Sequence, residues 1–276
     1  MNDRLAPAAA AIDMNAVVGT HDILFITLDT LRHDVAQAEF ERGALPTFAR
    51  HLPPAGWEAR HTPGSFTYAA HHAFFAGFLP TPAAPGRHAR LFAAAFEGSA
   101  TTARETCVFE QATVVEGLAA RGYRTVCIGG VGFFNKRSAL CSVLPALFDE
   151  SHWTPALGVT HRHSTERQVA LALRRLAQIE GRVFLFVNVS AIHFPNHPFL
   201  DELPSHPKDT LASHAAALRY VDGALAPLFD ACARRAPTLA IVCSDHGTLY
   251  GEDGFDGHRL AHPGVWTVPY AHFFLG

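Results

Sequence analysis

The sequence has few cysteines, and their arrangement excludes a disulfide framework. Its 276 residues contain five cysteines, an odd number, and none of them forms a Cys-x-x-Cys pair. A small disulfide scaffold or a zinc site built from cysteine pairs is therefore not expected. We predict free core thiols in a reducing compartment, at Cys107, Cys127, Cys141, Cys232 and Cys243.

An excess of basic charge and an apolar leader are also missing. The formal net charge is −3, so no basic surface for nucleic acid or for an anionic membrane is expected. The Ala-rich start carries Asp3 and Arg4, lacks the apolar centre of a signal peptide and is too short to cross a bilayer. We therefore predict a cytoplasmic protein without a membrane or nucleic-acid partner, in which residues 1–20 form a flexible lead-in.

Hydrophobic residues, in contrast, make up 49% of the chain, which is enough to build the core of one large domain. Short apolar runs rich in β-branched residues alternate with stretches of helical periodicity. The expected strands are residues 22–28, 124–129, 183–189, 239–243 and 268–275, and the expected helices are residues 69–78, 113–121, 164–179 and 214–235, the last interrupted near Gly223. This alternation predicts an α/β fold, a mostly parallel central sheet sandwiched by helices, in one domain over residues 21–276.

Two predicted strands end in acidic residues, although they are far apart in the sequence. Asp29 follows the strand at 22–28, and Asp245 and His246 follow the strand at 239–243. In an open α/β sheet, ligands gather beyond the carboxyl ends of the strands. Two carboxylates and one imidazole suit a divalent ion, Zn or Mn ahead of Ca or Mg. The sequence therefore predicts a metal site at this edge of the sheet.

A hydroxyl group near the start of the predicted helix at 69–78 would complete such a site. At a helix N-terminus, a Ser or Thr hydroxyl can contact the metal and act as a nucleophile, and the helix end favours an arriving anion. Thr67 and Ser65 both lie just before this helix. From its position alone, Thr67 could equally be a helix N-cap.

Five motifs in this order resemble those of the alkaline phosphatase superfamily, and within it the sulfatase-like branch. Residues 27–34, Thr-Leu-Asp-Thr-Leu-Arg-His-Asp, resemble the first metal-binding motif, and residues 244–247, Ser-Asp-His-Gly, resemble the second. The run Phe-Phe-Ala-Gly-Phe-Leu-Pro at 74–80 resembles the segment that follows the nucleophile of the family, and Thr67 lies ten residues before Gly77.

The two remaining motifs extend the resemblance to the end of the chain. Residues 116–125 resemble the Leu-x-x-x-Gly-Tyr-x-Thr unit of helix and strand, and residues 254–258, followed by Val268-Pro269, resemble the closing segment. The resemblance implies the superfamily fold, a divalent metal held by Asp29, Thr67, Asp245 and His246, and Thr67 as the catalytic nucleophile.

The chain departs from the family pattern in two ways. Sulfatases carry Cys or Ser in a Cys-x-Pro-x-Arg motif and oxidise it to formylglycine, a route that Thr67 cannot follow, and His71 stands at the position of the arginine. The chain also stops soon after Val268-Pro269, where most relatives continue with a small C-terminal subdomain. We therefore expect a minimal catalytic core that lacks this subdomain, with a partner subunit or a second copy of the chain completing the pocket.

Several histidines are candidates for the rest of the site. The resemblance implies catalytic roles for His193 and His258 at the transferred or leaving group. A second metal or the substrate would be bound from the set His193, His258, His262 and His71, with Asp201 as an acidic candidate. His71 and His72 face different ways on a helix, so at most one of them reaches the site. We assign no chemistry to Asp34 and Ser164, expected as helix caps, to His197, expected in a surface loop, or to His161, His163, His206 and His214, expected as solvated side chains.

The expected function is metal-dependent hydrolysis of phosphate mono- or diesters through a phospho-threonine intermediate at Thr67. The first alternative is a phosphotransferase that moves a phospho-head group to an acceptor hydroxyl, and the second is a sulfatase. The substrate would be a small-molecule phosphate or sulfate ester. An alternative of another class is a non-catalytic metal-binding partner protein.

Overall fold

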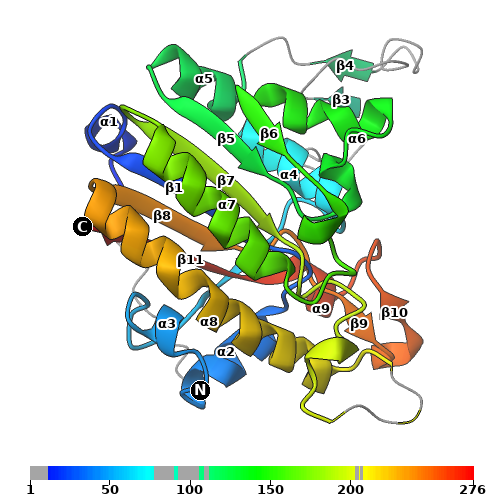
Figure 1. Ribbon diagram of the computed structural model, residues 1–276. Helices are drawn as coiled ribbons and strands as arrows, with labels where there is room; N and C mark the ends of the chain where they lie inside the picture. The colour runs from blue at the N-terminus through cyan, green and yellow to red at the C-terminus, as the bar shows by residue number, and fades with distance from the viewer. Residues whose placement is uncertain (1–11, 78–89, 93–105, 109–111, 203–204, 206–207) are drawn as a thin grey trace, which may run out of the picture.

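A computed structural model describes residues 12–77, 90–92, 106–108, 112–202, 205 and 208–276 (Figure 1). Residues 1–11 of the predicted lead-in, residues 78–80 of the third motif and His206 lie outside the described residues.

The centre of the fold is a seven-stranded sheet with the strand order β2-β11-β8-β1-β7-β5-β6. Its strands are β1 (Asp22–Leu28), β2 (Glu58–His61), β5 (Arg124–Ile128), β6 (Glu150–His152), β7 (Val183–Val189), β8 (Thr238–Cys243) and β11 (Thr267–Leu275). The pairs from β8 to β6 are parallel, whereas β11 runs antiparallel to both β8 and β2. The prediction of a mostly parallel sheet is confirmed, and the five predicted strands all belong to it.

Helices cover both faces of this sheet, as Figure 1 shows for α7 and α8 on one face and α4 on the other. The helices are α1 (Met14–Val17), α2 (His33–Glu41), α3 (Pro46–Ala49), α4 (Thr67–Ala76), α5 (Val114–Ala120), α6 (Ala139–Val143), α7 (Ser164–Gln178), α8 (Leu211–Arg235) and α9 (Pro263–Trp266). The smaller pieces are β3 (Arg90–Phe92), β4 (Thr106–Val108), β9 (Leu249–Tyr250), β10 (Asp256–Gly257) and short 3₁₀ turns at 132–134, 145–147, 155–157, 197–199 and 252–254.

The central strands are apolar along their whole length because both faces are buried. Every residue of β7 is buried. In β1, Leu24 packs into the cluster that contains α7 and α8, whereas Ile23 packs into the cluster that contains Phe75 of α4. Two hydrophobic layers therefore hold the sheet rigidly, and its carboxyl edge can position the side chains that come after β1 and β8.

Three local predictions are wrong. The helix α8 continues through Gly223, because tertiary burial of residues such as Val221 and Leu225 outweighs the modest helix penalty of glycine. The N-cap of α7 is His163 without a side-chain cap bond, so Ser164 is the first helical residue rather than its cap. Helix α4 begins at Thr67, two residues earlier than expected.

The described part of the predicted lead-in is folded rather than unstructured. Residues 14–17 form α1, and Val17 is buried in the core. The backbone N–H of Gly19 donates a 2.8 Å hydrogen bond to the hydroxyl oxygen of Tyr123, which joins this segment to the start of β5. Within the described ranges, no helix is both long and apolar enough to cross a membrane.

Candidate active site

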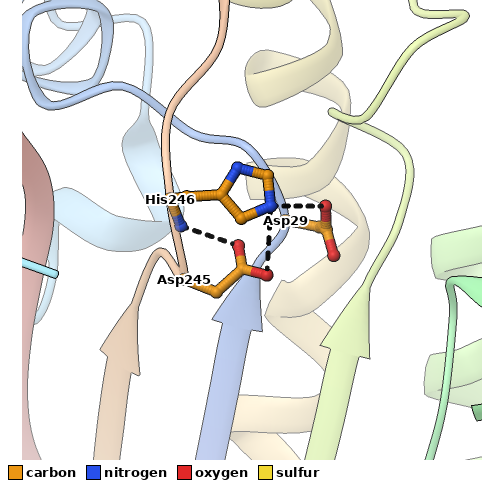
Figure 2. Close-up of side chains that lie close together, drawn as sticks. All are labelled: Asp29, Asp245 and His246. Atoms are coloured by element: carbon orange, nitrogen blue, oxygen red, sulfur yellow. Dashed lines mark hydrogen bonds and ion pairs between the residues drawn. The ribbon is translucent and has the colours of Figure 1, made fainter. Parts of the chain in front are cut away.

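Asp29, Asp245 and His246 meet at the carboxyl ends of the neighbouring strands β1 and β8 (Figure 2). The Nε2 atom of His246 lies 3.9 Å from Asp29 Oδ1 and 3.6 Å from Asp245 Oδ2. All three side chains are fully buried. One ligand atom from each lies within 4.8 Å of the others, so the two carboxylates that are distant in sequence share one site.

Each carboxylate directs one oxygen toward the protein and one toward the shared space. Asp245 Oδ1 accepts hydrogen bonds from the backbone N–H groups of Thr30 (3.2 Å) and His246 (3.0 Å), and Asp29 Oδ2 accepts one from Asn188 Nδ2 (3.1 Å). Asp29 Oδ1 and Asp245 Oδ2 are buried and have no hydrogen-bond partner in the described structure. Buried carboxylate oxygens without donors need a cation. The residues present therefore fit a divalent metal.

Burial also disfavours the charged form of both carboxylates when no cation is bound. Burial, and after it the nearby Asp245, raise the pKa of Asp29 to about 6. Burial raises the pKa of Asp245 to about 7. Two adjacent buried carboxylates are unfavourable by themselves, and a positive ion between them removes that penalty.

His246 is held in the form that can bind a metal. Its Nδ1 lies 2.9 Å from the carbonyl oxygen of Gly247, which only accepts, so Nδ1 carries the proton and Nε2 presents its lone pair to the site. Burial lowers the pKa of His246, which keeps the ring neutral. The close packing at Gly247 fixes this turn, because a Cβ there would lie 2.0 Å from the carbonyl oxygen of Gly264.

Thr67, the predicted nucleophile, lies beside these ligands as the first residue of α4. Its Oγ1 is 3.4 Å from Asp29 Oδ2 and 3.4 Å from His246 Nε2. The N-cap of α4 is Phe66, so Thr67 does not cap the helix and its hydroxyl is directed to the site. Ser65, the rival candidate, accepts a hydrogen bond at its backbone carbonyl from the N–H of Arg259 (2.9 Å), and among the described residues its hydroxyl makes no hydrogen bond to the three ligands.

A chain of buried hydrogen bonds behind the site joins α4 to the sheet. Asn188 Nδ2 donates to Thr27 Oγ1 (3.2 Å) as well as to Asp29, and the Thr27 hydroxyl donates to His71 Nε2 (2.9 Å). His71 Nδ1 donates to the carbonyl oxygen of Thr67 (2.7 Å). Burial lowers the pKa of His71 to about 3, so this ring is neutral. Both ring nitrogens of His71 are therefore bonded inside the protein, and the predicted role of His71 at the substrate or a second metal stays a prediction.

His193 and His258 lie on the outer side of the metal ligands. The ring centroids of His246 and His258 are 4.4 Å apart, and those of His258 and His193 are 5.9 Å apart. His193 Nδ1 donates to the carbonyl oxygen of Phe194 (2.7 Å), which leaves Nε2 available. His258 Nδ1 is buried without a partner in the described structure, and burial, together with the adjacent His246, lowers its pKa to about 3. The structure brings both predicted histidines to one cluster.

His262 forms its hydrogen bonds with residues outside this cluster. Its Nδ1 accepts from the N–H of Gly264 (2.9 Å) as the N-cap of α9, and its Nε2 lies 3.0 Å from Asp253 Oδ2. Both nitrogens are thus engaged by the protein, and the second-metal or substrate role of His262 stays a prediction. Asp201 is exposed, and it is not part of the three-ligand group.

Two of the residues expected to lack chemistry differ from their predicted positions. His214 is buried rather than solvated: its Nε2 accepts from the N–H of Arg32 (3.4 Å), and its Nδ1 lies 2.8 Å from the hydroxyl of Tyr250. His214 lies in the first turns of α8, a helix that packs against the loops at the carboxyl edge. Asp34 lies inside the first turn of α2, and it binds the guanidinium of Arg32 instead of acting as N-cap.

Two other histidines that were expected to lack chemistry are paired near the surface. His163 Nδ1 lies 2.7 Å from a carboxylate oxygen of Glu166, and His197 Nδ1 lies 2.9 Å from Asp209 Oδ1. His161 is half-buried beside His163. Four of the five cysteines are free thiols, and three of them, Cys127, Cys232 and Cys243, are buried as predicted, whereas Cys141 is only half-buried.

Asn188, Asn196 and Tyr250 support the site, and sequence reasoning missed all three. Asn188 Oδ1 accepts from the N–H groups of Gly130 (3.2 Å) and Val131 (3.0 Å) while its Nδ2 holds Asp29. Asn196 donates to the Tyr250 hydroxyl (2.8 Å). One polar residue in the apolar run at 183–189 was the available signal for Asn188, whereas no local pattern marked the other two.

Comparison with protein families agrees with this site geometry. Residues 22–271 match the sulfatase family model. The chain belongs to the sulfatase family. This membership supports an enzyme that acts on phosphate or sulfate esters. No curated protein sequence matches the chain.

Solved structures with the same fold are distant in sequence. The chain is similar to the periplasmic domain of phosphoethanolamine transferase EptC from Campylobacter jejuni, with a TM-score of 0.63 and 12% identity over 92% of this chain and 80% of that one. The soluble domain of lipooligosaccharide phosphoethanolamine transferase A from Neisseria meningitidis has a TM-score of 0.64 and 13% identity, over 93% of this chain and 77% of that one. A structure named as the putative sulfatase yidJ from Bacteroides fragilis has a TM-score of 0.60 and 14% identity, over 97% of this chain and 70% of that one. At these identities the likeness establishes the alkaline-phosphatase-like fold.

Proposed function

We propose that this protein is a metal-dependent phosphotransferase that moves a phospho-head group from a donor ester to an acceptor hydroxyl. The observation that carries the proposal is the position of Thr67 Oγ1, 3.4 Å from both Asp29 and His246, beside two carboxylate oxygens that lack donors among the described residues. A nucleophile, a cation site and a helix N-terminus are thereby assembled for an anionic ester.

In the first half of the reaction, Thr67 Oγ1 forms a bond to phosphorus and the bond from phosphorus to the donor oxygen breaks. The hydroxyl proton of Thr67 moves toward Asp29 Oδ2, the nearest carboxylate oxygen. The leaving oxygen takes its proton from Nε2 of the protonated His193 ring, a nitrogen that is free of protein partners in the described structure. The product of this half is phospho-threonine.

In the second half, the acceptor hydroxyl oxygen attacks phosphorus and the bond to Thr67 Oγ1 breaks. The proton that Asp29 Oδ2 took returns to Thr67 Oγ1, and the acceptor's proton passes to His193, which gave its own proton to the donor oxygen. The ring of His258, which burial keeps neutral, can accept a hydrogen bond from the acceptor hydroxyl. A divalent cation at Asp29, Asp245 and His246, when bound, would supply the positive charge that stabilises the phosphoryl transition state. Asn188 holds Asp29 in place throughout.

Transfer is favoured over the hydrolysis that the sequence predicts. Structural neighbours at 12–13% identity are named as phosphoethanolamine transferases, and another is named as a lipoteichoic acid synthase from Listeria monocytogenes. Hydrolysis would use the same phospho-threonine with water as the acceptor. Sulfuryl transfer by the formylglycine route is disfavoured because Thr67 replaces Cys or Ser. The cytoplasmic location stays a prediction, and three of the structural neighbours are named as periplasmic domains.

Product analysis tests the proposal. Purified protein with added Zn or Mn is incubated with p-nitrophenyl phosphate mono- and diesters, with and without an added alcohol. A phosphotransferase forms the phosphorylated alcohol at the expense of free phosphate. Free phosphate as the sole product, whatever the alcohol, would establish the hydrolase, and metal-loaded protein without turnover of any ester would favour the non-catalytic alternative.

A further inference from the structure

A basic cleft lies at the β6 edge of the sheet. This edge is the one farther from β8 and β1, the strands that precede the metal ligands. The cleft is bounded by the edge strand β6 and by α7, and its volume is about 590 Å³. The strands β7 and β5 separate β1 from β6, so at the usual strand spacing this edge is roughly 14 Å from β1. The cleft is therefore distinct from the site of Thr67.

The fixed charges on the cleft wall all have the same sign. Lys136, Arg167 and Arg174 line it, together with His152, and no Asp or Glu of the described ranges does. The whole chain has a net charge of −3, so three cations without an acidic partner on this wall are a local reversal of the protein's charge.

Two of these cationic side chains have no partner among the described residues. Arg167 and Arg174 are seven residues apart on α7 and therefore share one face of the helix. Among the described residues, neither guanidinium has an ion pair or a hydrogen bond. Their neighbour Arg175 shows the opposite behaviour, because it donates to Glu150 at 3.0 Å. The chain thus neutralises an adjacent arginine and leaves these two unpaired within the part that the structure describes.

The third cation is held in place by the backbone. Lys136 has a positive φ of 58°, an uncommon conformation for a residue other than glycine, and its Nζ donates to the carbonyl oxygen of Ser151 (2.8 Å). The wall beside it is also fixed, since Trp153 Nε1 donates to the carbonyl oxygen of Gly130 (2.9 Å). The ammonium group has three donors, so it keeps some that this single bond does not use.

We propose that this cleft binds the phosphate group of a phosphorylated ligand through Lys136, Arg167 and Arg174. The guanidinium fork matches phosphate oxygens in pairs, and the ammonium adds a compact positive charge. The site does not depend on turnover at Thr67, so it can be tested on protein without metal.

Calorimetric titration with inorganic phosphate tests the site after dialysis against EDTA. Wild-type protein should bind phosphate, more weakly as salt is raised, and R167Q/R174Q should lose about tenfold or more in affinity. The matched control is R162Q/R234Q, which removes the same charge from two exposed arginines outside the cleft and should bind like the wild type. Thermal unfolding checks that the variants fold.

A second arm identifies the source of the phosphate. Vesicles of phosphatidylcholine with phosphatidate are compared with vesicles of phosphatidylcholine alone. Retention on phosphatidate that requires Arg167 and Arg174 identifies a lipid head group, and phosphate binding without retention identifies a soluble ligand. Equal behaviour of wild type and R167Q/R174Q in both arms, or no binding in either, overturns the proposal. These binding results do not depend on the proposed transferase activity at Thr67, so the two proposals can fail separately.

Discussion

The hydroxyl oxygen of Thr67 lies 3.4 Å from a carboxylate oxygen of Asp29, although the two residues are 38 positions apart and lie on different elements. Asp29 comes directly after β1, and Thr67 begins α4. The contact is maintained by the bonds from Asn188 to Asp29 and from His71 to the carbonyl of Thr67. The nucleophile and the metal ligand are therefore positioned by one buried network.

Replacing Thr67 by alanine should abolish turnover while leaving the metal site. T67A removes the attacking oxygen but keeps the Asp29, Asp245 and His246 ligands, so we expect about 10³-fold lower activity while metal binding partly persists. T67S keeps a hydroxyl and should retain part of the activity. Turnover assays with elemental analysis check this, and T67A with wild-type activity would show that another group is the nucleophile.

Asn188 should control metal affinity through Asp29. N188L keeps the size of the side chain but removes the donor to Asp29 Oδ2 and the acceptor for Gly130 and Val131, so we expect about 10- to 100-fold weaker metal binding. T27V is the matched control, because it removes the other two bonds of this network, from Asn188 to Thr27 and from Thr27 to His71, and spares the bond from Asn188 to Asp29. Competition with a chelating dye measures both affinities, and equal affinities would contradict the role of Asn188.

Acid should destabilise the protein partly through His214. Burial lowers the pKa of His214 to about 3, below the ordinary value of 6.5, so the unfolded chain binds a proton that the folded chain excludes. The stability from this group is complete above pH 6.5 and is lost as the pH falls toward 3. Over this window it removes about 1.4 kcal/mol per pH unit.

The variant H214Q isolates this contribution. Glutamine does not titrate, so the free energy of unfolding of H214Q should fall less steeply between pH 6 and pH 4, even if the variant is less stable at pH 7. Urea unfolding at several pH values measures the slopes. Parallel slopes for wild type and H214Q would mean that another group carries the acid sensitivity.

Much of the fold and of the first metal ligands can be predicted, because local patterns encode these features. Strand β7 is recognisable as an apolar run, and Asp29 and Asp245 are recognisable as acidic residues at the ends of such runs. The pairing of His262 and the burial of His214 could not be predicted in this way. Whether a histidine nitrogen is free depends on partners such as Asp253 and Tyr250, which only the folded chain brings near. Burial and pairing of single polar groups are tertiary properties that periodicity does not encode.

Two glycines of the chain should respond in opposite ways to alanine. At Gly247 a Cβ would lie 2.0 Å from the backbone oxygen of Gly264, so G247A must displace the turn that carries His246 and should reduce both stability and metal binding. At Gly223, inside α8, a Cβ meets no described atom within 4 Å, so G223A should stabilise the protein by about 0.5–1 kcal/mol. Thermal unfolding with metal titration checks the pair, and a G247A variant with wild-type metal affinity would contradict the proposed packing.

Tyr250 should couple the two loops that carry His193 and His258. Its hydroxyl accepts from Asn196, which lies three residues beyond His193, and is 2.8 Å from His214, while its own hairpin leads to His258. Y250F leaves buried polar groups without a partner, so we expect a loss of about 1–3 kcal/mol in the free energy of unfolding. We also expect kcat to fall more than KM changes, because the two histidines act on the leaving and acceptor oxygens.

The control for Y250F is Y270F, since the Tyr270 hydroxyl makes no hydrogen bond among the described residues and its ring packs against Arg60. Y270F should keep the kcat of the wild type. Both variants are assayed well below their melting temperatures, so that the folded fraction does not limit the rate. If Y250F is less stable but turns over like Y270F, the Tyr250 hydroxyl supports only the fold, and the histidine loops are positioned by other contacts.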